Sequence, residues 1–302
     1  MIKIILLASA ILLMTLNVLA QKGGAPDYTI FDGSGREVSL DDLIDRAGGV
    51  DVLFLGEFHD DSVGHALQME VFRRVFEKYG RERSVALSME MFERDVQYVV
   101  DEYLRGLITE EHFLASSRPW KNYKTDYRPL VEFAKENKLP VIAANAPRRY
   151  VNMVSRNGRG ALDALSKGAK KTLPPLPYGK SSEAYSEKFI NLMSAMPAAS
   201  GENSNVNRIL ESQTLWDSAM GYSIAKYLKK AKKPLVVQLN GGFHSESRLG
   251  TPEQMVKYRK KTRFIVVTMR YEKDFRKFDP GKHKDIGDFV VLTDASKPRS
   301  GK

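Results

Sequence analysis

The chain has 302 residues, 42% of them hydrophobic, and is therefore long enough to bury the core of one or two globular domains. It contains no cysteine, which excludes disulfides, thiolate metal sites, cysteine nucleophiles and lipid attachment through a cysteine. Its formal charge of +10 would suit an anionic ligand, but the excess is spread through the chain and is only slightly denser at 226–233, 257–263 and 297–302. No nucleic-acid-binding signature accompanies it, and we interpret it as a solvated basic face. No nucleic-acid partner is expected.

The first twenty residues have the pattern of a signal peptide. Lys3 precedes an apolar stretch at 4–16, and Val18-Leu19-Ala20 is typical of a cleavage site. The stretch is shorter than the roughly 20 apolar residues of a membrane-spanning helix. We therefore predict export to the periplasm or the extracellular space after cleavage near Ala20. An uncleaved N-terminal anchor is the alternative, and membrane association stays open because there is no cysteine to acylate.

Strand-like and helix-like segments then alternate along the chain. We expect a hairpin at 28–38, strands at 52–55, 84–89, 141–144, 235–239, 264–269 and 289–292, and helices at 63–79 and 129–136. At 251–254, a threonine, a proline and a glutamine stand in the order of an N-cap, an N1 proline and a capping box. The strands at 52–55 and 235–239 are apolar at successive positions, so both of their faces are buried. This pattern predicts an α/β fold with a mostly parallel central sheet flanked by helices.

The character of the sequence changes after residue 158. Pro174, Pro175 and Pro177 exclude a regular element around them, because proline lacks an N–H donor and fixes φ. An apolar stripe at helical spacing follows from Tyr185 to Met196, and we interpret it as packing. We predict a small all-helical insert at 159–212 within an α/β domain formed by 27–158 and 213–296.

Two short motifs that lie nearly two hundred residues apart in the sequence match each other. The strand at 52–55 runs into Gly56-Glu57-Phe58-His59, and the strand at 235–239 runs into Gly241-Gly242-Phe243-His244. In parallel sheets, ligands bind beyond the carboxyl ends of the strands. Glu90 and Asn145 follow two further predicted strands. We expect these polar side chains to converge at one edge of the sheet, where Gln213 and Asp217, four apart on one helix face, would help to close the site.

Two kinds of chemistry fit this group of residues. Glu57, His59, Glu90 and His244 have the side chains of many divalent-metal sites. They are equally suited to act as general acids and bases around a bound substrate. Asp217 has a simpler alternative, an ion pair with a neighbouring lysine. The remaining histidines, His65, His112 and His283, are interpreted as surface or packing residues, and Asp60 and Asp61 as helix N-terminal residues.

These motifs resemble the ChaN-like haem-binding uptake family of the Tiki superfamily. The resemblance rests on ordered segments that cover most of the chain from about Val52 to Met269: LGEFHD at 55–60, EMFERD at 90–95, DYRPL at 126–130, NAPR at 145–148, WDSAM at 216–220 and GGFH at 241–244. It implies a parallel-sheet domain with a smaller helical domain, and haem binding in iron acquisition, plausibly across a homodimer. It also implies a tyrosine on the haem iron, for which Tyr150, Tyr178 and Tyr185 are candidates, with histidine near the propionates.

The wider superfamily gives the rival hypothesis. Its relatives look like metal-dependent proteases or esterases, including the erythromycin-esterase type, that use the same histidines and glutamates. In this case Glu57, His59, Glu90 and His244 would bind a divalent metal or activate water, and Asn145 would orient a carbonyl.

Overall fold

A computed structural model describes residues 26–195 and 206–300 of the chain. The predicted signal peptide at 1–20 lies outside these residues. Eight strands form one sheet in the order β2-β1-β8-β7-β3-β6-β4-β5. Their bounds are β1 Tyr28–Asp32, β2 Glu37–Val38, β3 Val52–Glu57, β4 Ser84–Glu93, β5 Val141–Asn145, β6 Pro234–Gly241, β7 Phe264–Glu272 and β8 Phe289–Asp294.

The sheet is parallel from β8 to β5, and the β1–β2 hairpin joins its edge in the antiparallel sense. The predicted α/β class with a mostly parallel sheet is therefore confirmed. The helices are α1 Leu40–Ala47, α2 Ser62–Tyr79, α3 Gln97–Leu104, α4 Glu110–Ser117, α5 Arg128–Glu136, α6 Arg148–Asn157, α7 Lys167–Lys170, α8 Glu183–Ala195, α9 Val206–Lys230, α10 Thr251–Tyr258 and α11 Pro280–His283. Short helical turns are η1 Arg94–Val96, η2 Tyr123–Tyr127, η3 Arg159–Ala164, η5 Gly242–His244 and η6 Glu246–Arg248.

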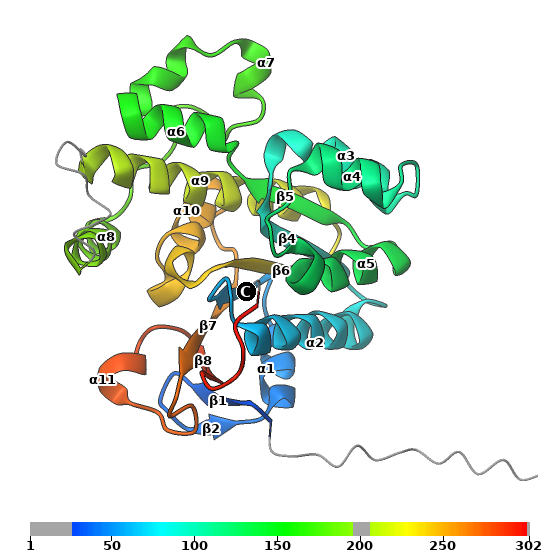
Figure 1. The fold of residues 1–302 in the computed structure, drawn as a ribbon, viewed down its shortest axis with the longest axis vertical. Coiled ribbons are helices and arrows are strands. Elements are labelled where there is room, and N and C mark those ends of the chain that lie inside the picture. Colours follow the sequence, from blue (N-terminus) through cyan, green and yellow to red (C-terminus); the bar gives the residue numbers. More distant parts are fainter. Residues whose placement is uncertain (1–25, 196–205, 301–302) are drawn as a thin grey trace, which may run out of the picture.

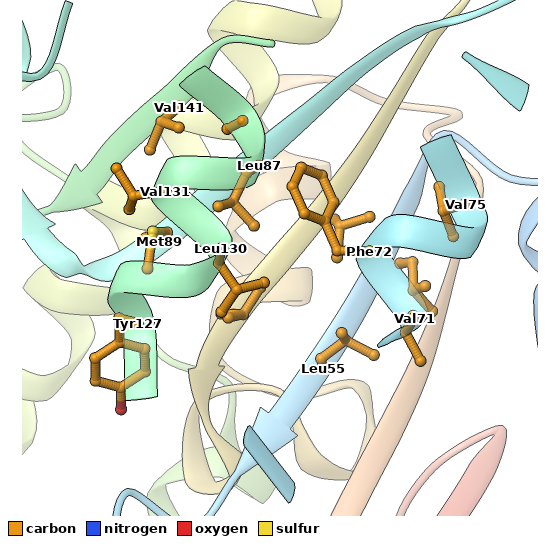
Figure 2. Packing of buried hydrophobic residues seen from close by; sticks show 14 of the residues in the cluster. Leu55, Val71, Phe72, Val75, Leu87, Met89, Tyr127, Leu130, Val131 and Val141 are labelled. Carbon is orange, nitrogen blue, oxygen red and sulfur yellow. The ribbon is translucent and has the colours of Figure 1, made fainter. Parts of the chain in front are cut away.

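The apolar strands lie between two hydrophobic cores. Alternate side chains of a strand point to opposite faces, so Leu53 and Leu55 of β3 enter a core with α2 and α5, while Val52 and Phe54 enter a second core with α9 and α10. Figure 2 shows the first core, in which α2 and α5 pack side by side over the sheet. Burial on both faces explains why these strands carry no polar alternation.

A helical region packs on one end of the sheet domain (Figure 1). Its small core joins Val151 and Val154 of α6 to Leu162, Leu173 and Tyr178, and to Leu215 and Ala219 of α9. Helix α9 runs without a break across the expected boundary between 212 and 213. The division into an α/β domain and an insert stays a prediction. In the described residues, no helix combines the length and the apolar character needed to cross a membrane.

One helix start differs from its prediction. The N-cap of α10 is Gly250, which has a φ of 67°, and it has no side-chain cap. The Thr251 hydroxyl instead donates to Asp217 Oδ1 at 2.8 Å, and the Gln254 amide donates to the Lys180 carbonyl at 3.0 Å. The predicted capping box is therefore wrong, because both of its side chains are engaged in tertiary contacts.

Candidate functional site

A cavity of about 730 Å3 opens at the carboxyl edge of the sheet. Its walls include the predicted Glu57, His59, Glu90, Asn145 and His244, as well as Gln213. The parallel register pairs Glu57 of β3 with Gly241 of β6, so the two Gly-x-x-His segments leave the sheet at the same level. An adjoining hollow of about 830 Å3 shares Glu90, Trp120, Asn145, Arg148 and Trp216 with it.

Glu57 is buried at the end of β3 and holds His59. Its Oε1 lies 2.9 Å from His59 Nδ1 and accepts the Tyr127 hydroxyl at 2.6 Å, while its Oε2 accepts the Gln68 amide at 2.6 Å. Burial alone would raise the pKa of Glu57, but the hydrogen bonds and the nearby His65 and His59 lower it overall. Glu57 is therefore a buried carboxylate whose oxygens are already engaged.

His59 projects from this carboxylate into the cavity, with 48% of its side chain exposed. Burial opposes its charged form, but the hydrogen bond to Glu57 and the charge of Glu90 raise its pKa above 6.5 overall. Within the described chain, Nε2 has no hydrogen-bond partner, and the Trp120 ring lies edge-on with a centroid distance of 4.8 Å. His59 is thus oriented by the protein and open to a ligand.

Residues behind His59 fix its backbone. The Asn122 amide donates to the His59 carbonyl at 2.9 Å, and His65 Nε2 lies 3.2 Å from the same oxygen. His65 Nδ1 also lies 3.1 Å from Gln68 Oε1. The interpretation of His65 as a surface or packing residue misses this polar role, since it is buried and supports the site. Tyr127, whose hydroxyl points away from the apolar core in Figure 2, completes the support of Glu57.

Gln68, Tyr127 and Asn122 are not among the site residues predicted from the sequence, although Tyr127 lies in the DYRPL segment. A signal was present in α2, where His65 and Gln68 lie on the face that also carries Leu67, Val71 and Phe72 into the core. Polar side chains at buried helix positions need partners. His283 and His112 lie elsewhere: His283 is buried against Glu272, at 3.0 Å from Nε2 to Oε1, and His112 is exposed on α4.

His244 belongs to a second imidazole–carboxylate pair. Its Nδ1 lies 2.9 Å from Oδ1 of the buried Asp217, which also accepts Thr251, while the Tyr185 hydroxyl donates to Oδ2. Asp217 therefore pairs with His244 and not with a lysine. Burial would lower the pKa of His244, but the carboxylates of Asp217 and Glu90 raise it to about 9. This shift favours the imidazolium form of His244 at the cavity wall.

Glu90 lies between the two histidine segments. Its Oε2 accepts the Gly241 N–H at 2.7 Å, and its Oε1 is 3.8 Å from His244 Nε2. The sequence placed Glu90 just after a strand ending at Met89, but β4 continues to Glu93 with a register shift against β5 between Met89 and Glu93. Such bulges redirect side chains and are common beside functional sites. Asn145 ends β5, and its Oδ1 accepts the Ala146 N–H at 2.9 Å.

The candidate haem-ligating tyrosines do not line the cavity. Tyr185 and Tyr178 are buried, and their hydroxyls donate to Asp217 and to the Glu211 carbonyl. Burial raises the pKa of both phenols, and nearby Asp217 raises that of Tyr185 further. Tyr150 is partly exposed beneath Arg149, with 4.4 Å from Cζ to the ring centroid. A haem-iron role for any of these tyrosines stays a prediction.

The cavity walls combine aromatic rings and cations. Trp120, Trp216, Phe189 and Phe243 line it, and Phe58 and Leu192 expose 41% and 42% of their surface at its rim. Arg148 is exposed, faces both hollows and makes no ion pair within the described chain. In the parts of the chain that the structure describes, no group of three or more His, Asp or Glu side chains is arranged to hold a metal ion.

The family model described as "Haem-binding uptake, Tiki superfamily, ChaN" matches residues 43–255. The chain belongs to this haem-binding uptake family. Among solved structures, the ChaN of Campylobacter jejuni, described with cofacial heme binding, superimposes with a TM-score of 0.67 at 18% identity, over 88% of this chain and 96% of that one. This likeness confirms the fold.

A more distant likeness is to an open-conformation mutant of the erythromycin esterase EreC, with a TM-score of 0.46 and 11% identity over 84% of this chain and 78% of that one. No protein with a curated description matches the sequence.

Proposed function

We propose that this protein is an exported haem-binding protein of haem or iron uptake, and that haem binds in the cavity at the carboxyl edge of the sheet. Family membership gives the ligand class. The cavity volume of about 730 Å3 lies within the usual range of about 300–1,000 Å3 for small-molecule sites. Aromatic walls suit a flat macrocycle, for which dispersion and apolar burial are the main attractions.

The polar groups of the cavity match the rest of the ligand. Haem carries two propionate carboxylates. The cations that line the cavity are the His244 imidazolium, Arg148, Arg270, which pairs with Glu246, and, below its raised pKa, His59. The observation that speaks most directly for a ligand is His59, which Glu57 orients and which projects into the cavity with no partner at Nε2 within the described residues. Gln213 also lines the cavity, and its buried Oε1 accepts no hydrogen bond there. Buried polar atoms without partners are rare and call for a ligand or a water.

The test is a haemin titration of the protein followed by visible absorbance. We expect saturable binding that weakens at least tenfold in a His59→Ala/His244→Ala double variant. The matched control is His112→Ala, which removes an exposed histidine on α4 that does not line the cavity. This variant should bind haemin like the wild type. Tyr150→Phe, Tyr178→Phe and Tyr185→Phe report whether a phenolate ligates the iron, since its loss changes the spectrum and not just the affinity. Absence of saturable binding would refute the proposal.

We propose further that a second copy of the chain covers the haem. The exposed Phe58 and Leu192 at the cavity rim, and Ile190 on the same helix as Leu192, would be buried by a partner. Sedimentation velocity with and without haemin tests this assembly: a dimer that forms on haemin addition and is lost in Phe58→Ser/Leu192→Ser is expected. A monomer at saturating haemin would contradict it.

A second candidate function is hydrolysis, favoured by the two histidine–carboxylate pairs on either side of Glu90. Glu57 orients His59 and Asp217 orients His244, as in general acid–base sites. The divalent-metal form of this hypothesis lacks a ready ligand group in the described chain, because no three of its His, Asp and Glu side chains are arranged to hold an ion and both oxygens of Glu57 already accept hydrogen bonds. Metal-independent hydrolysis would be supported by turnover of ester or peptide substrates that persists in the presence of a chelator and is lost in the double histidine variant. No turnover above that of the variant would exclude it.

A further inference from the structure

A third hollow, of about 670 Å3, lies between α7, the proline-rich stretch after it and the C-terminal half of α9. It shares no lining residue with the haem cavity. Four lysines face it, namely Lys167, Lys170, Lys171 and Lys226, against one acidic side chain, Asp163. The hollow is therefore strongly cationic. Lys226, the first residue of the basic stretch at 226–233, lines it, whereas no residue of that stretch lines the haem cavity.

The charges in this hollow are not neutralised by the protein. Within residues 26–195 and 206–300, none of the four ammonium groups makes an ion pair, and Lys170 Nζ donates to the backbone carbonyl of Asp163 at 2.8 Å. Burial lowers the pKa of Lys226, and the charges of Arg94 and Lys230 lower it further. This repulsion is what a nearby anion would relieve.

Arg94 adds a cation behind the same wall. Its Nε donates to the Thr172 carbonyl at 2.9 Å, its Nη1 donates to the Ser223 hydroxyl, and its Cζ lies 5.0 Å from the ring centroid of Tyr222, which lines the hollow. None of these partners is a carboxylate. Burial lowers the pKa of Arg94, and only the phenols of Tyr222 and Tyr258, with no carboxylate, act against that effect. A largely buried guanidinium without a counter-ion is costly unless an anion is supplied from outside.

The far wall of the hollow is apolar. Leu173 and Pro174 are buried, and Pro175, Leu176 and Tyr222 complete the lining. The prolines fix φ at their own positions in this wall, and Lys167, Lys170 and Lys226 lie on helices α7 and α9. Several point charges beside an apolar wall suit a multiply charged head group with a short organic part.

We propose that this hollow binds a phosphate group, carried either by a small phosphorylated molecule or by the head group of an anionic lipid. The site is independent of haem binding, since it shares no residue with that cavity. A lipid head group would hold the helical region against a membrane without acylation. A soluble phosphorylated compound would instead be a second ligand of the protein.

The test uses pyrophosphate in calorimetry and, separately, co-sedimentation with vesicles of phosphatidylglycerol or of phosphatidylcholine. The variant is Lys167→Glu/Lys171→Glu/Lys226→Glu. Lys170 is not substituted, because its Nζ donates to the backbone carbonyl of Asp163. The matched control is Lys260→Glu/Lys273→Glu/Lys277→Glu, which makes the same change of charge at exposed lysines on another part of the surface. The N-terminal apolar stretch is identical in all three proteins, so differences in vesicle binding report the substituted lysines.

We expect binding that weakens at least tenfold in the hollow variant and less than threefold in the control, and that falls as salt is raised. Pyrophosphate binding with this pattern identifies a soluble phosphate ligand. Binding to phosphatidylglycerol vesicles alone, with the same pattern, identifies a head group. Binding of neither probe, or equal loss in both variants, overturns the proposal. Haemin titration of the three proteins confirms that the substitutions leave the fold and the sheet-edge cavity intact.

Discussion

The imidazole of His59 lies against the backbone of Gly241, so closely that a Cβ placed on the glycine would come within 2.8 Å of His59 Cε1 and 2.9 Å of Nε2. The other motif repeats this close approach. A Cβ on Gly56 would lie 2.9 Å from Ser245 Oγ and 3.0 Å from Gly242 Cα. The two Gly-x-x-His segments therefore pack tightly against each other at both glycines, which explains why each begins with a residue that has no Cβ.

Gly241→Ala tests this contact. The backbone of Gly241, with φ −56° and ψ 136°, accepts alanine, so the new methyl acts through the His59 ring alone. The half-exposed ring moves readily, and we expect a change in unfolding free energy below about 1 kcal/mol. The displaced His59 should lose its bond to Glu57, its pKa should fall toward 6.5, and haemin affinity should drop about tenfold.

Histidine NMR titration and haemin absorbance measure these effects. The control is Gly160→Ala, where an added Cβ meets nothing within 4 Å. An unchanged His59 pKa in Gly241→Ala would show that the ring does not depend on this glycine.

Tyr127→Phe tests the buried support of Glu57. The substitution removes the hydroxyl that donates to Glu57 Oε1 at 2.6 Å and leaves a buried carboxylate with one donor fewer. Loss of a buried hydrogen bond to a charged group costs about 1–3 kcal/mol of unfolding free energy. Urea unfolding should show this loss, whereas Tyr98→Phe, at a tyrosine that is 65% exposed, should change the free energy by less than about 0.5 kcal/mol. Equal stability of the two variants would contradict a structural role for the Tyr127 hydroxyl.

The strands and the convergence of polar groups at their ends could be predicted because each depends on local pattern and on the geometry of parallel sheets. The position of Glu90 inside β4 could not, since a bulge depends on how two strands pair and leaves no local mark. The hydrogen-bond partners of Asp217 could not be predicted from the sequence either. Tyr185, His244 and Thr251 come from three separate elements, and only tertiary packing brings them to one carboxylate. The prediction that Thr251 caps α10 is wrong for the same reason, since its hydroxyl bonds to Asp217.

The raised pKa of His244 predicts a pH dependence of stability. The folded-state value of about 9 exceeds the ordinary 6.5, so protonated His244 stabilises the fold fully below pH 6.5. This contribution declines as the pH rises from 6.5 and is gone above about 9. Its size is on the order of 3 kcal/mol. Unfolding free energies of the wild type and His244→Gln, measured from pH 6 to pH 10, should converge toward high pH. A difference independent of pH would show that His244 is not protonated in the fold.

Asp217→Asn checks the cause of that shift. Without the carboxylate at 2.9 Å from Nδ1, burial dominates, and the pKa of His244 should fall below 9 toward or under its ordinary value. Histidine NMR titration reports this directly. The conservative Asp217→Glu keeps a negative charge and should retain a raised pKa. A His244 that still titrates near 9 in Asp217→Asn would assign the shift to Glu90 instead.

Arg148→Ala tests whether the exposed guanidinium at the cavity contacts a haem propionate. Arg148 faces both hollows and makes no ion pair within the described residues, so its removal should leave the unfolding free energy unchanged. An exposed charge pair contributes up to about 1 kcal/mol, which corresponds to roughly a fivefold weaker binding of haemin. Haemin dimethyl ester, which has no propionate charge, should bind wild type and Arg148→Ala equally. Comparing the two ligands on the two proteins separates a carboxylate contact from a change in cavity shape, because a change in shape would weaken the binding of both ligands alike. Arg81→Ala, at another exposed arginine, is the control for net charge.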